Sequence, residues 1–238
     1  MNKKITLLHL YPNEMNIYGD RGNILTILRR LEWHGYEPEL VYHHPDRRFP
    51  GDIDIIIGGG GQDSGQNKVQ NDLLHINEEL RKLADDGVPM LMICGLYQLF
   101  GRFFKTSDGE TIRGINIFDA ETHGGPKRLI GNVVIETPFG EVIGYENHSG
   151  QTYLDKSQKP FGSIKKGSGN NGRDRTEGAI YKNVIGSYLH GSLLPKNPDL
   201  ADSLIQKAAE RKFGDFDGTV IDDNFARLAR EVAKNRPR

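Results

Sequence analysis

The chain has 238 residues, 31 lysines and arginines against 32 aspartates and glutamates, and a single cysteine. A formal charge of −1, with both signs interspersed, lacks the basic bias of a nucleic-acid-binding protein. One cysteine excludes a disulfide framework and a cysteine-rich zinc site. The apolar stretch at residues 5–10 is too short for a signal sequence or a membrane span, so we expect a soluble, cytoplasmic protein.

The first half of the chain alternates between strand-like and helix-like segments. Apolar runs end in glycine or polar loops, and the segments between them carry apolar residues at helical spacing, such as Ile24, Leu28 and Leu31. This order is typical of a doubly wound α/β sheet, in which ligands bind at the carboxyl ends of the strands. The expected strands are 5–10, 37–42, 52–57 and 89–93, and the expected helices are 23–34, 69–86 and one from residue 96.

The second half of the chain is rich in β-forming residues separated by turns. The expected strands are 129–136, 141–145, 179–182 and 184–188, followed by helices at 198–213 and 222–234. The glycine- and asparagine-rich segment 162–178 is expected to be a mobile loop. We therefore predict an α/β fold with a doubly wound, mostly parallel sheet, flanking helices and an added β-rich C-terminal half. Residues 1–238 are expected to form one domain.

The segment around Cys94 has the pattern of a nucleophile elbow. A buried apolar strand runs directly into Cys94 and Gly95, and a helical pattern follows from Leu96. This geometry exposes the side chain at the sheet edge, and the adjacent helix start favours a thiolate. The alternative is a buried structural thiol, which is the commoner role of a lone cysteine.

The run of four glycines from Gly58 to Gly61 ends another expected strand at the same sheet edge. It lacks the Gly-Lys-Ser/Thr of a phosphate-binding loop and the spacing of a dinucleotide-binding loop. Backbone N–H groups presented there would suit a developing oxyanion. A plain turn is the alternative interpretation.

A thiolate nucleophile needs a proton acceptor, which is most often a histidine. His190 follows an apolar strand and precedes Gly191, which places it at a strand end where a substrate has access. A capping role for this histidine is the alternative. His148 is a second candidate of lower rank. The histidines in helical or surface-like contexts are expected to be solvated, namely His34, His43, His44 and His75.

Several blocks of the sequence resemble the class I (triad-type) glutamine amidotransferases. Residues 93–98 look like their elbow, with Gln98 four positions after Cys94, and residues 184–191 resemble the Gly-Ser/Thr-Tyr-x-His-Gly block of the cobyric acid synthase branch. The resemblance is closer still to the glutaminase subunits of lipid II isoglutaminyl synthases and spans nearly the whole chain. The blocks that carry it are residues 18–23, 58–63, 128–131, 144–150 and 177–183.

The resemblance implies a cysteine-dependent glutaminase. Cys94 would attack the side-chain amide carbon of glutamine, and His190 would take the thiol proton and pass it to the leaving ammonia. Water would then hydrolyse the γ-glutamyl thioester. The tetrahedral oxyanion would be held by backbone N–H groups of Gly59, Gly60, Gly61 and Gly95.

The resemblance also implies a substrate pocket. An arginine at the position of Arg128 is associated with glutamine binding in this family, and a guanidinium suits the α-carboxylate. Without the resemblance, Arg128 would be interpreted as a surface arginine beside Lys127. Gln98, Asn147 and His148 are expected to line the same pocket, although Gln98 would equally suit local bonding within its helix.

The sequence departs from the family pattern after the histidine. Most triad amidotransferases have a glutamate two residues later, whereas this chain has Ser192, as the cobyric acid synthase branch does. The third catalytic member is therefore open. Asp20 is a candidate because its loop belongs to the active edge of the sheet, and an acid from a partner protein is another.

No ATP-binding motif occurs in the chain, so no cofactor and no metal are expected in it. The resemblance implies a heterodimer with a Mur-ligase-like (MurT-type) subunit that carries ATP and Mg²⁺. That subunit would activate D-glutamate of lipid II for conversion to D-isoglutamine in peptidoglycan synthesis. A different carboxylate acceptor, such as a corrinoid, and a non-enzymatic α/β binding module are the alternatives.

Overall fold

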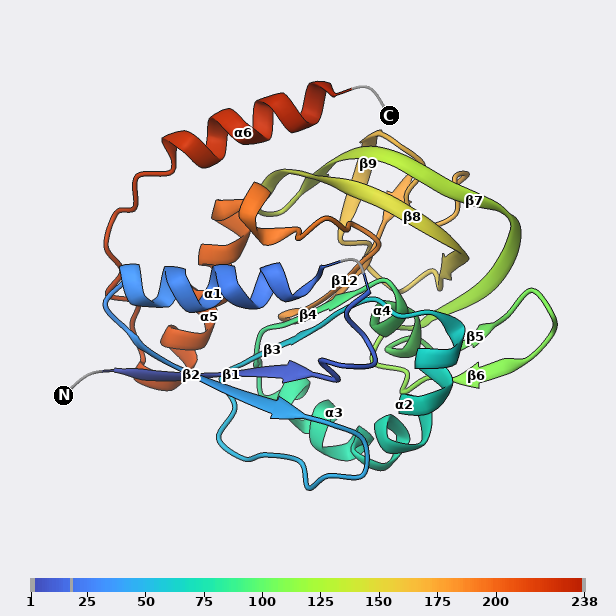
Figure 1. The fold of residues 1–238 in the computed structure, drawn as a ribbon, viewed down its shortest axis with the longest axis horizontal. Coiled ribbons are helices and arrows are strands. Elements are labelled where there is room, and N and C mark those ends of the chain that lie inside the picture. The colour runs from blue at the N-terminus through green and yellow to red at the C-terminus, as the bar shows by residue number, and fades with distance from the viewer. Residues whose placement is uncertain (1–2, 18, 237–238) are drawn as a thin grey trace.

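The computed structural model describes residues 3–17 and 19–236, and a six-stranded sheet lies at its centre (Figure 1). The strand order is β11-β12-β4-β3-β1-β2, and every neighbouring pair is parallel except β11 with β12. This arrangement confirms the α/β fold class. The strands are β1 (Lys4–Leu10), β2 (Glu37–His43), β3 (Ile55–Gly58), β4 (Met90–Ile93), β11 (Ala179–Tyr181) and β12 (Val184–Ser187).

Helices cover both faces of this sheet. Helices α1 and α5 pack against each other on one face, whereas α2 and α3 lie on the other (Figure 1). Every residue of the central strands β3 and β4 is buried, which explains why both strands read as continuous apolar runs. The helices are α1 (Arg21–Trp33), α2 (Asp63–His75), α3 (Asn77–Asp85), α4 (Gly95–Leu99), α5 (Pro198–Phe213) and α6 (Asn224–Asn235), with a 3-10 turn η1 (Leu194–Lys196).

The β-rich second half of the chain builds another six-stranded sheet, which runs beside the first (Figure 1). Its order is β10-β9-β7-β5-β6, and β8 pairs with β7 in a long antiparallel hairpin. A single bridge between Tyr145 of β8 and His190 joins this hairpin to the chain beyond β12. The strands are β5 (Phe103–Lys105), β6 (Thr111–Arg113), β7 (Ala120–Thr137), β8 (Gly140–Leu154), β9 (Gly162–Lys166) and β10 (Thr176–Glu177).

The helix expected over residues 69–86 is two helices, and the first begins six residues earlier, at Asp63. Ile76 separates them with a ψ of 10°, and its side chain is buried. The bend lets the apolar faces of both helices reach the core, through Leu73 of α2 and Leu80 of α3.

The prediction of a mobile loop over residues 162–178 is wrong at both ends, where β9 and β10 pair with each other. Two asparagines organise the turn between them. The Asn170 amide donates to Gly178 O at 3.0 Å, and the Asn171 amide donates to Thr152 O at 3.0 Å. Glycine and asparagine are abundant in flexible loops, so the composition of the segment gave no indication that its asparagines form buried hydrogen bonds.

Two histidines that were expected to be solvated are buried. His43 is fully buried and its Nε2 lies 2.8 Å from Asp72 Oδ2, while His34 Nε2 lies 3.0 Å from Asp202 Oδ1. In each case the carboxylate partner comes from a distant part of the chain, so the sequence near the histidine gave no sign of it. His75 is exposed and His44 is partly exposed.

Within residues 3–17 and 19–236, none of the helices has the length and apolar character needed to cross a membrane.

Candidate active site

Cys94 lies in the turn between β4 and α4, and its backbone is held in an unusual conformation. Its φ is 50°, a left-handed value that residues with a Cβ seldom adopt and that costs about 1–3 kcal/mol. The Cys94 N–H donates to Ser187 O at 2.8 Å, and the Gln98 N–H donates to Cys94 O at 3.0 Å. The neighbouring strand and the following helix therefore hold the strained turn, as a nucleophile elbow requires.

His190 reaches the same point from the adjacent strand. It follows β12, which is the parallel neighbour of β4, and its N–H donates to Tyr145 O at 2.8 Å. The side chain is 2% exposed. Burial lowers the pKa of His190, but electrostatic interactions and hydrogen bonds with Cys94 and Asp20 together outweigh burial and raise that pKa to about 10. His190 is thus protonated at neutral pH and can serve as an acid.

Asp20 lies beside His190 and is almost completely buried. Its Oδ1 is 3.6 Å from His190 Nδ1, and its Oδ2 accepts the Gly60 N–H at 2.7 Å. Ser192, at the position where most triad enzymes carry glutamate, instead donates from its hydroxyl to Gly19 O at 2.8 Å. The serine therefore fastens the loop that carries the carboxylate. Tyr18, in the same sequence block, lies outside the described residues.

Gly60 packs against all three of these side chains. A Cβ at this position would lie 2.9 Å from His190 Cε1, 3.2 Å from Cys94 Cβ and 3.4 Å from Asp20 Oδ2. Any side chain larger than hydrogen would push the cluster apart. Because the Gly60 N–H is donated to Asp20, the expectation that it holds an oxyanion does not fit the structure.

The N–H groups of Gly61 and Gly95 are better placed to hold an oxyanion. A Cβ on Gly95 would lie 3.0 Å from the Gly61 nitrogen, so the two backbones approach closely beside the elbow. Neither N–H takes part in a hydrogen bond with the other described residues. Gly59 has a packing role, because a Cβ there would lie 2.4 Å from Met15 O and 2.8 Å from Asp20 Cβ.

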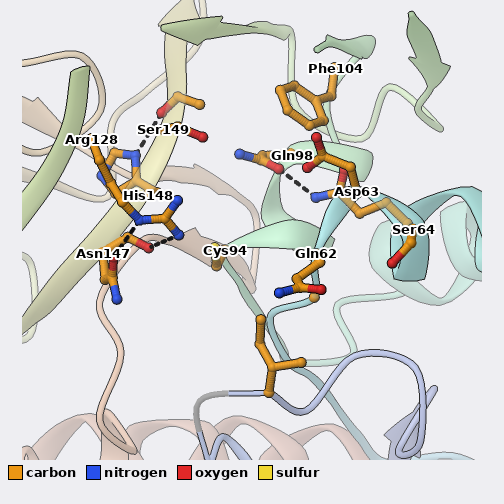
Figure 2. A pocket seen from close by; sticks show the side chains of 14 residues that line it. Gln62, Asp63, Ser64, Cys94, Gln98, Phe104, Arg128, Asn147, His148 and Ser149 are labelled. Carbon is orange, nitrogen blue, oxygen red and sulfur yellow. Dashed lines mark hydrogen bonds between the residues drawn. The ribbon is translucent and has the colours of Figure 1, made fainter. Parts of the chain in front are cut away.

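A cavity of about 390 Å³ opens above Cys94. Figure 2 shows Arg128 and Asn147 on one side and Asp63 on the opposite side, with Cys94 between them. Arg128 Nε donates to Asn147 Oδ1 at 2.7 Å, which fixes the guanidinium against β8. The lining also includes Ile17, Gly61, Gln62, Ser64, Gln66, Gln98, Phe104, His148, Ser149 and Gly150.

His148 forms part of the wall. Its ring stacks on Tyr188 with centroids 3.6 Å apart and planes 4° from parallel, and its Nδ1 lies 2.6 Å from Gly150 O. Burial lowers the pKa of His148 to about 4, so the ring is neutral at physiological pH. A stacked, neutral ring therefore forms a fixed part of the cavity wall.

Gln98 belongs to a hydrogen-bonded chain of buried side chains. Gln66 Nε2 donates to Gln98 Oε1 at 2.6 Å, and Gln98 Nε2 donates to Tyr188 OH at 3.1 Å. Tyr188 OH in turn lies 2.7 Å from Thr152 Oγ1. Gln66 Oε1 is a buried acceptor that has no hydrogen-bond partner among the described residues.

Asp63 and Gln66 are site residues that the sequence reasoning missed. They lie three positions apart on α2, so they share the helix face that lines the cavity. Burial and the nearby charge of Asp108 raise the pKa of Asp63. The missed signal was the helix start, because a helix drawn from residue 69 left both residues in a loop.

No group of three or more histidine, cysteine, aspartate or glutamate side chains in the described parts of the chain is placed to hold a metal ion.

A cysteine on a strained elbow, a histidine from the next parallel strand and a glycine run at the same sheet edge are the features of a thiol-dependent amidotransferase. The CobB/CobQ-like glutamine amidotransferase domain matches residues 6–198. The chain belongs to this family.

Two curated relatives are similar over most of the chain, which confirms the resemblance seen in the sequence. Both are named lipid II isoglutaminyl synthase (glutamine-hydrolyzing) subunit GatD. The Staphylococcus aureus protein is 37% identical over 235 residues, which is 98% of this chain and 96% of that protein. The Streptococcus pneumoniae protein is 38% identical over 217 residues, 89% of this chain and 83% of that protein. The cobyric acid synthase of Rhizorhabdus wittichii is 26% identical over 83% of this chain and 40% of its own length.

Solved structures support the fold. A glutamine amidotransferase crystal structure superimposes with a TM-score of 0.60 at 15% identity, covering 85% of this chain and 98% of that chain. A second, from Thermotoga maritima, gives a TM-score of 0.54 at 14% identity over 97% of this chain and 93% of that chain.

The place of Asp20 beside His190 predicts a change in pH dependence. Replacing Asp20 with asparagine removes a charge that raises the pKa of His190, so that pKa falls and the alkaline limit of glutamine hydrolysis moves to lower pH. We expect kcat/KM to drop by about 10²-fold to 10⁴-fold. The measurement is the pH profile of ammonia release.

Ser192→Ala is the matched control, because it loosens the same loop without changing its charge. Its pH profile should overlay that of the wild type. If the alkaline limit of the Asp20→Asn protein does not move, Asp20 is not the residue that raises the pKa of His190 in the active protein.

Proposed function

We propose that this chain is the glutaminase subunit of a lipid II isoglutaminyl synthase. We also propose that residues 1–238 form a single domain and that the protein acts in the cytoplasm. It hydrolyses L-glutamine to glutamate and ammonia. The observation that carries the proposal is the meeting of Cys94, His190 and Asp20 around Gly60, next to a cavity that Cys94 lines and that has an arginine on its wall. The two GatD relatives, similar over most of the chain, support the assignment to this synthase.

The chemistry follows from the positions of the groups. His190 holds the proton of the Cys94 thiol, so the sulfur attacks the side-chain amide carbon as a thiolate. The N–H groups of Gly61 and Gly95 hold the negative oxygen, each such donor being worth about 2.7–4 kcal/mol in a transition state. His190 gives its proton to the amide nitrogen, the C–N bond breaks, and ammonia leaves. The neutral His190 then takes a proton from water, whose oxygen attacks the γ-glutamyl thioester. The C–S bond breaks, glutamate leaves, and Cys94 returns as the thiolate beside the protonated His190.

The cavity walls suit the two charges of the amino acid. Arg128 faces the cavity from β7 and binds the α-carboxylate, with Asn147 fixing its guanidinium. On the opposite wall, the Asp63 carboxylate accepts hydrogen bonds from the α-ammonium, and Gln66 lines the cavity from the same helix. Gln98 and His148 complete the wall that orients the side-chain amide toward Cys94.

The ammonia needs an acceptor on another subunit. Both GatD relatives are named as subunits of a larger enzyme. We propose that the partner is a Mur-ligase-like subunit that binds ATP and Mg²⁺ and activates D-glutamate of lipid II, so that ammonia yields D-isoglutamine. A corrinoid carboxylate is the second candidate acceptor, because the cobyric acid synthase relative carries the same domain, although with lower identity.

Replacing Cys94 with serine tests the proposal directly. We expect glutamine hydrolysis to fall by at least about 10³-fold, since serine lacks a nucleophilic thiolate at neutral pH. Amidation of lipid II by the reconstituted pair should then fail with glutamine and proceed with ammonium chloride. The measurements are ammonia release and the mass of the lipid II product.

Retained glutamine hydrolysis in the Cys94→Ser protein would end the glutaminase assignment. If the wild-type pair uses ammonium but never glutamine, the chain has another task. Amidation of a corrinoid acid in place of lipid II would favour the second candidate.

The charged walls predict a substrate-specific loss. Asp63→Asn should lower kcat/KM for glutamine by about 10-fold to 100-fold, the value of a hydrogen bond to a charged group. The same variant should leave kcat/KM unchanged for glutaric acid monoamide, which lacks the α-ammonium. Arg128→Ala should show the reverse selectivity, with no loss on 4-aminobutanamide, which lacks the carboxylate.

Asp108→Asn is the control for these variants, since Asp108 is an acid near Asp63 that does not line the cavity. It should change kcat/KM for all three amides by a similar small factor. An equal loss on glutamine and on the monoamide in Asp63→Asn would remove Asp63 from the binding site.

A further inference from the structure

Helix α6 exposes its apolar residues and has no buried residue. Phe225 is 89% exposed, Leu228 is 64% exposed and Val232 is 51% exposed. Their spacing of three and four positions places them in one row along the helix. A contiguous apolar row on a surface helix marks an interaction site more often than an accident of composition.

The other side of α6 is fixed to the body of the protein by polar contacts. Arg230 donates to Lys196 O at 3.1 Å and also to Asn197 Oδ1, and Lys234 Nζ lies 2.7 Å from Glu141 Oε1. Turning the helix to bury the apolar row would break these bonds. The row is therefore held outward by the fold.

Phe225, the first residue of the row, lines a groove of about 460 Å³ between α6 and α1, and Leu228 and Val232 continue the row along α6 beyond the groove. Trp33 and Leu25 of α1 are 47% and 54% exposed along its edge. In Figure 1, α6 runs along the outside of the molecule, above α1. Leu25, Trp33, Phe225, Leu228 and Val232 are together called the α1–α6 surface below.

We propose that the α1–α6 surface is the docking site for the ATP-dependent synthase subunit, which would present apolar side chains to it. This inference rests on the proposed function. The CobB/CobQ-like domain match ends at residue 198, so α6 lies outside the part shared across the family. The Staphylococcus aureus GatD relative aligns over 98% of this chain, and that protein is named as one subunit of a synthase. Helix α6 therefore belongs to the part of the chain that extends beyond the family domain and that is aligned with a protein named as a synthase subunit.

The place of the surface also favours the synthase subunit. Helix α1 begins directly after Asp20, and η1, which lines the groove, follows His190 by four residues. The Leu194 N–H donates to Asn23 Oδ1 at 2.9 Å, which joins the two segments. A protein seated on the groove would contact the segments that follow Asp20 and His190 in the chain. Hydrolysis and ammonia use can be coupled through such a contact.

The charges of α6 do not favour an anionic membrane as the occupant. Membrane-surface helices turn lysine and arginine toward the lipid headgroups. In α6, Arg227 pairs with Asp199 at 3.0 Å, and Arg230 and Lys234 pair with Glu141. The basic residues are therefore used within the chain.

The test is the affinity of the full-length chain for the purified Mur-ligase-like subunit, measured by calorimetry for the wild type and for Phe225→Glu/Leu228→Glu. We expect the double variant to bind at least about 100-fold more weakly, as loss of two central apolar contacts predicts. Its melting temperature and glutamine hydrolysis without the partner should match the wild type. Tyr42→Glu, which alters an exposed aromatic residue on β2, should bind normally.

The other outcomes would overturn the proposal. Equal affinity of the double variant and the wild type would show that the synthase docks elsewhere. A wild-type dimer by light scattering that the double variant abolishes, with synthase binding intact, would assign the surface to a second copy of the chain. Flotation of the wild type with anionic vesicles and loss of flotation in the variant, again with synthase binding intact, would assign it to a membrane. A wild type that hydrolyses glutamine but binds no synthase would refute the partner in the proposed function as well.

Discussion

The site depends on the close approach of one glycine to three side chains. Gly60 has no Cβ, so its backbone packs directly on Cys94, His190 and Asp20, and its N–H fixes the Asp20 carboxylate. The parallel order β12-β4-β3-β1 brings these residues to one edge, since each strand delivers its following loop to the same side. A side chain at position 60 would separate the acid, the histidine and the cysteine at once.

This packing sets the charge distribution of the site. The interactions with Cys94 and Asp20 raise the pKa of the buried His190, whereas burial is the main cause of the lowered pKa of His148. Two histidines a short distance apart are thereby given different roles, one protonated and one neutral. The strained backbone of Cys94 and the hydrogen-bonded glutamines beneath the cavity keep these groups in place before any substrate binds.

Most residues at the sheet edge around Cys94 could be predicted, because the local sequence shows where apolar strands end and where glycine runs occur. Cys94, His190 and the glycine loop follow apolar strands, and the rules for parallel sheets place them together. The role of single glycines was not predictable, because the use of the Gly60 N–H by Asp20 depends on a contact across 40 residues. The part of the cavity wall formed by Asp63 and Gln66 was not predicted, because the helix expected from residue 69 begins at Asp63. The ordered turn at Asn170 and Asn171 was not predicted because one of its partners, Thr152, lies on β8, a strand from an earlier part of the chain.

In the proposed glutamine hydrolysis, Cys94 becomes covalently bound to the substrate. The most direct measurement is acid quenching of the protein during turnover with L-glutamine, followed by mass spectrometry of the peptide that contains Cys94. We expect a γ-glutamyl thioester on Cys94 that accumulates before steady state and disappears when glutamine is exhausted. Release of ammonia with no adduct on Cys94 at any quench time, while the Cys94 peptide is fully recovered, would contradict it.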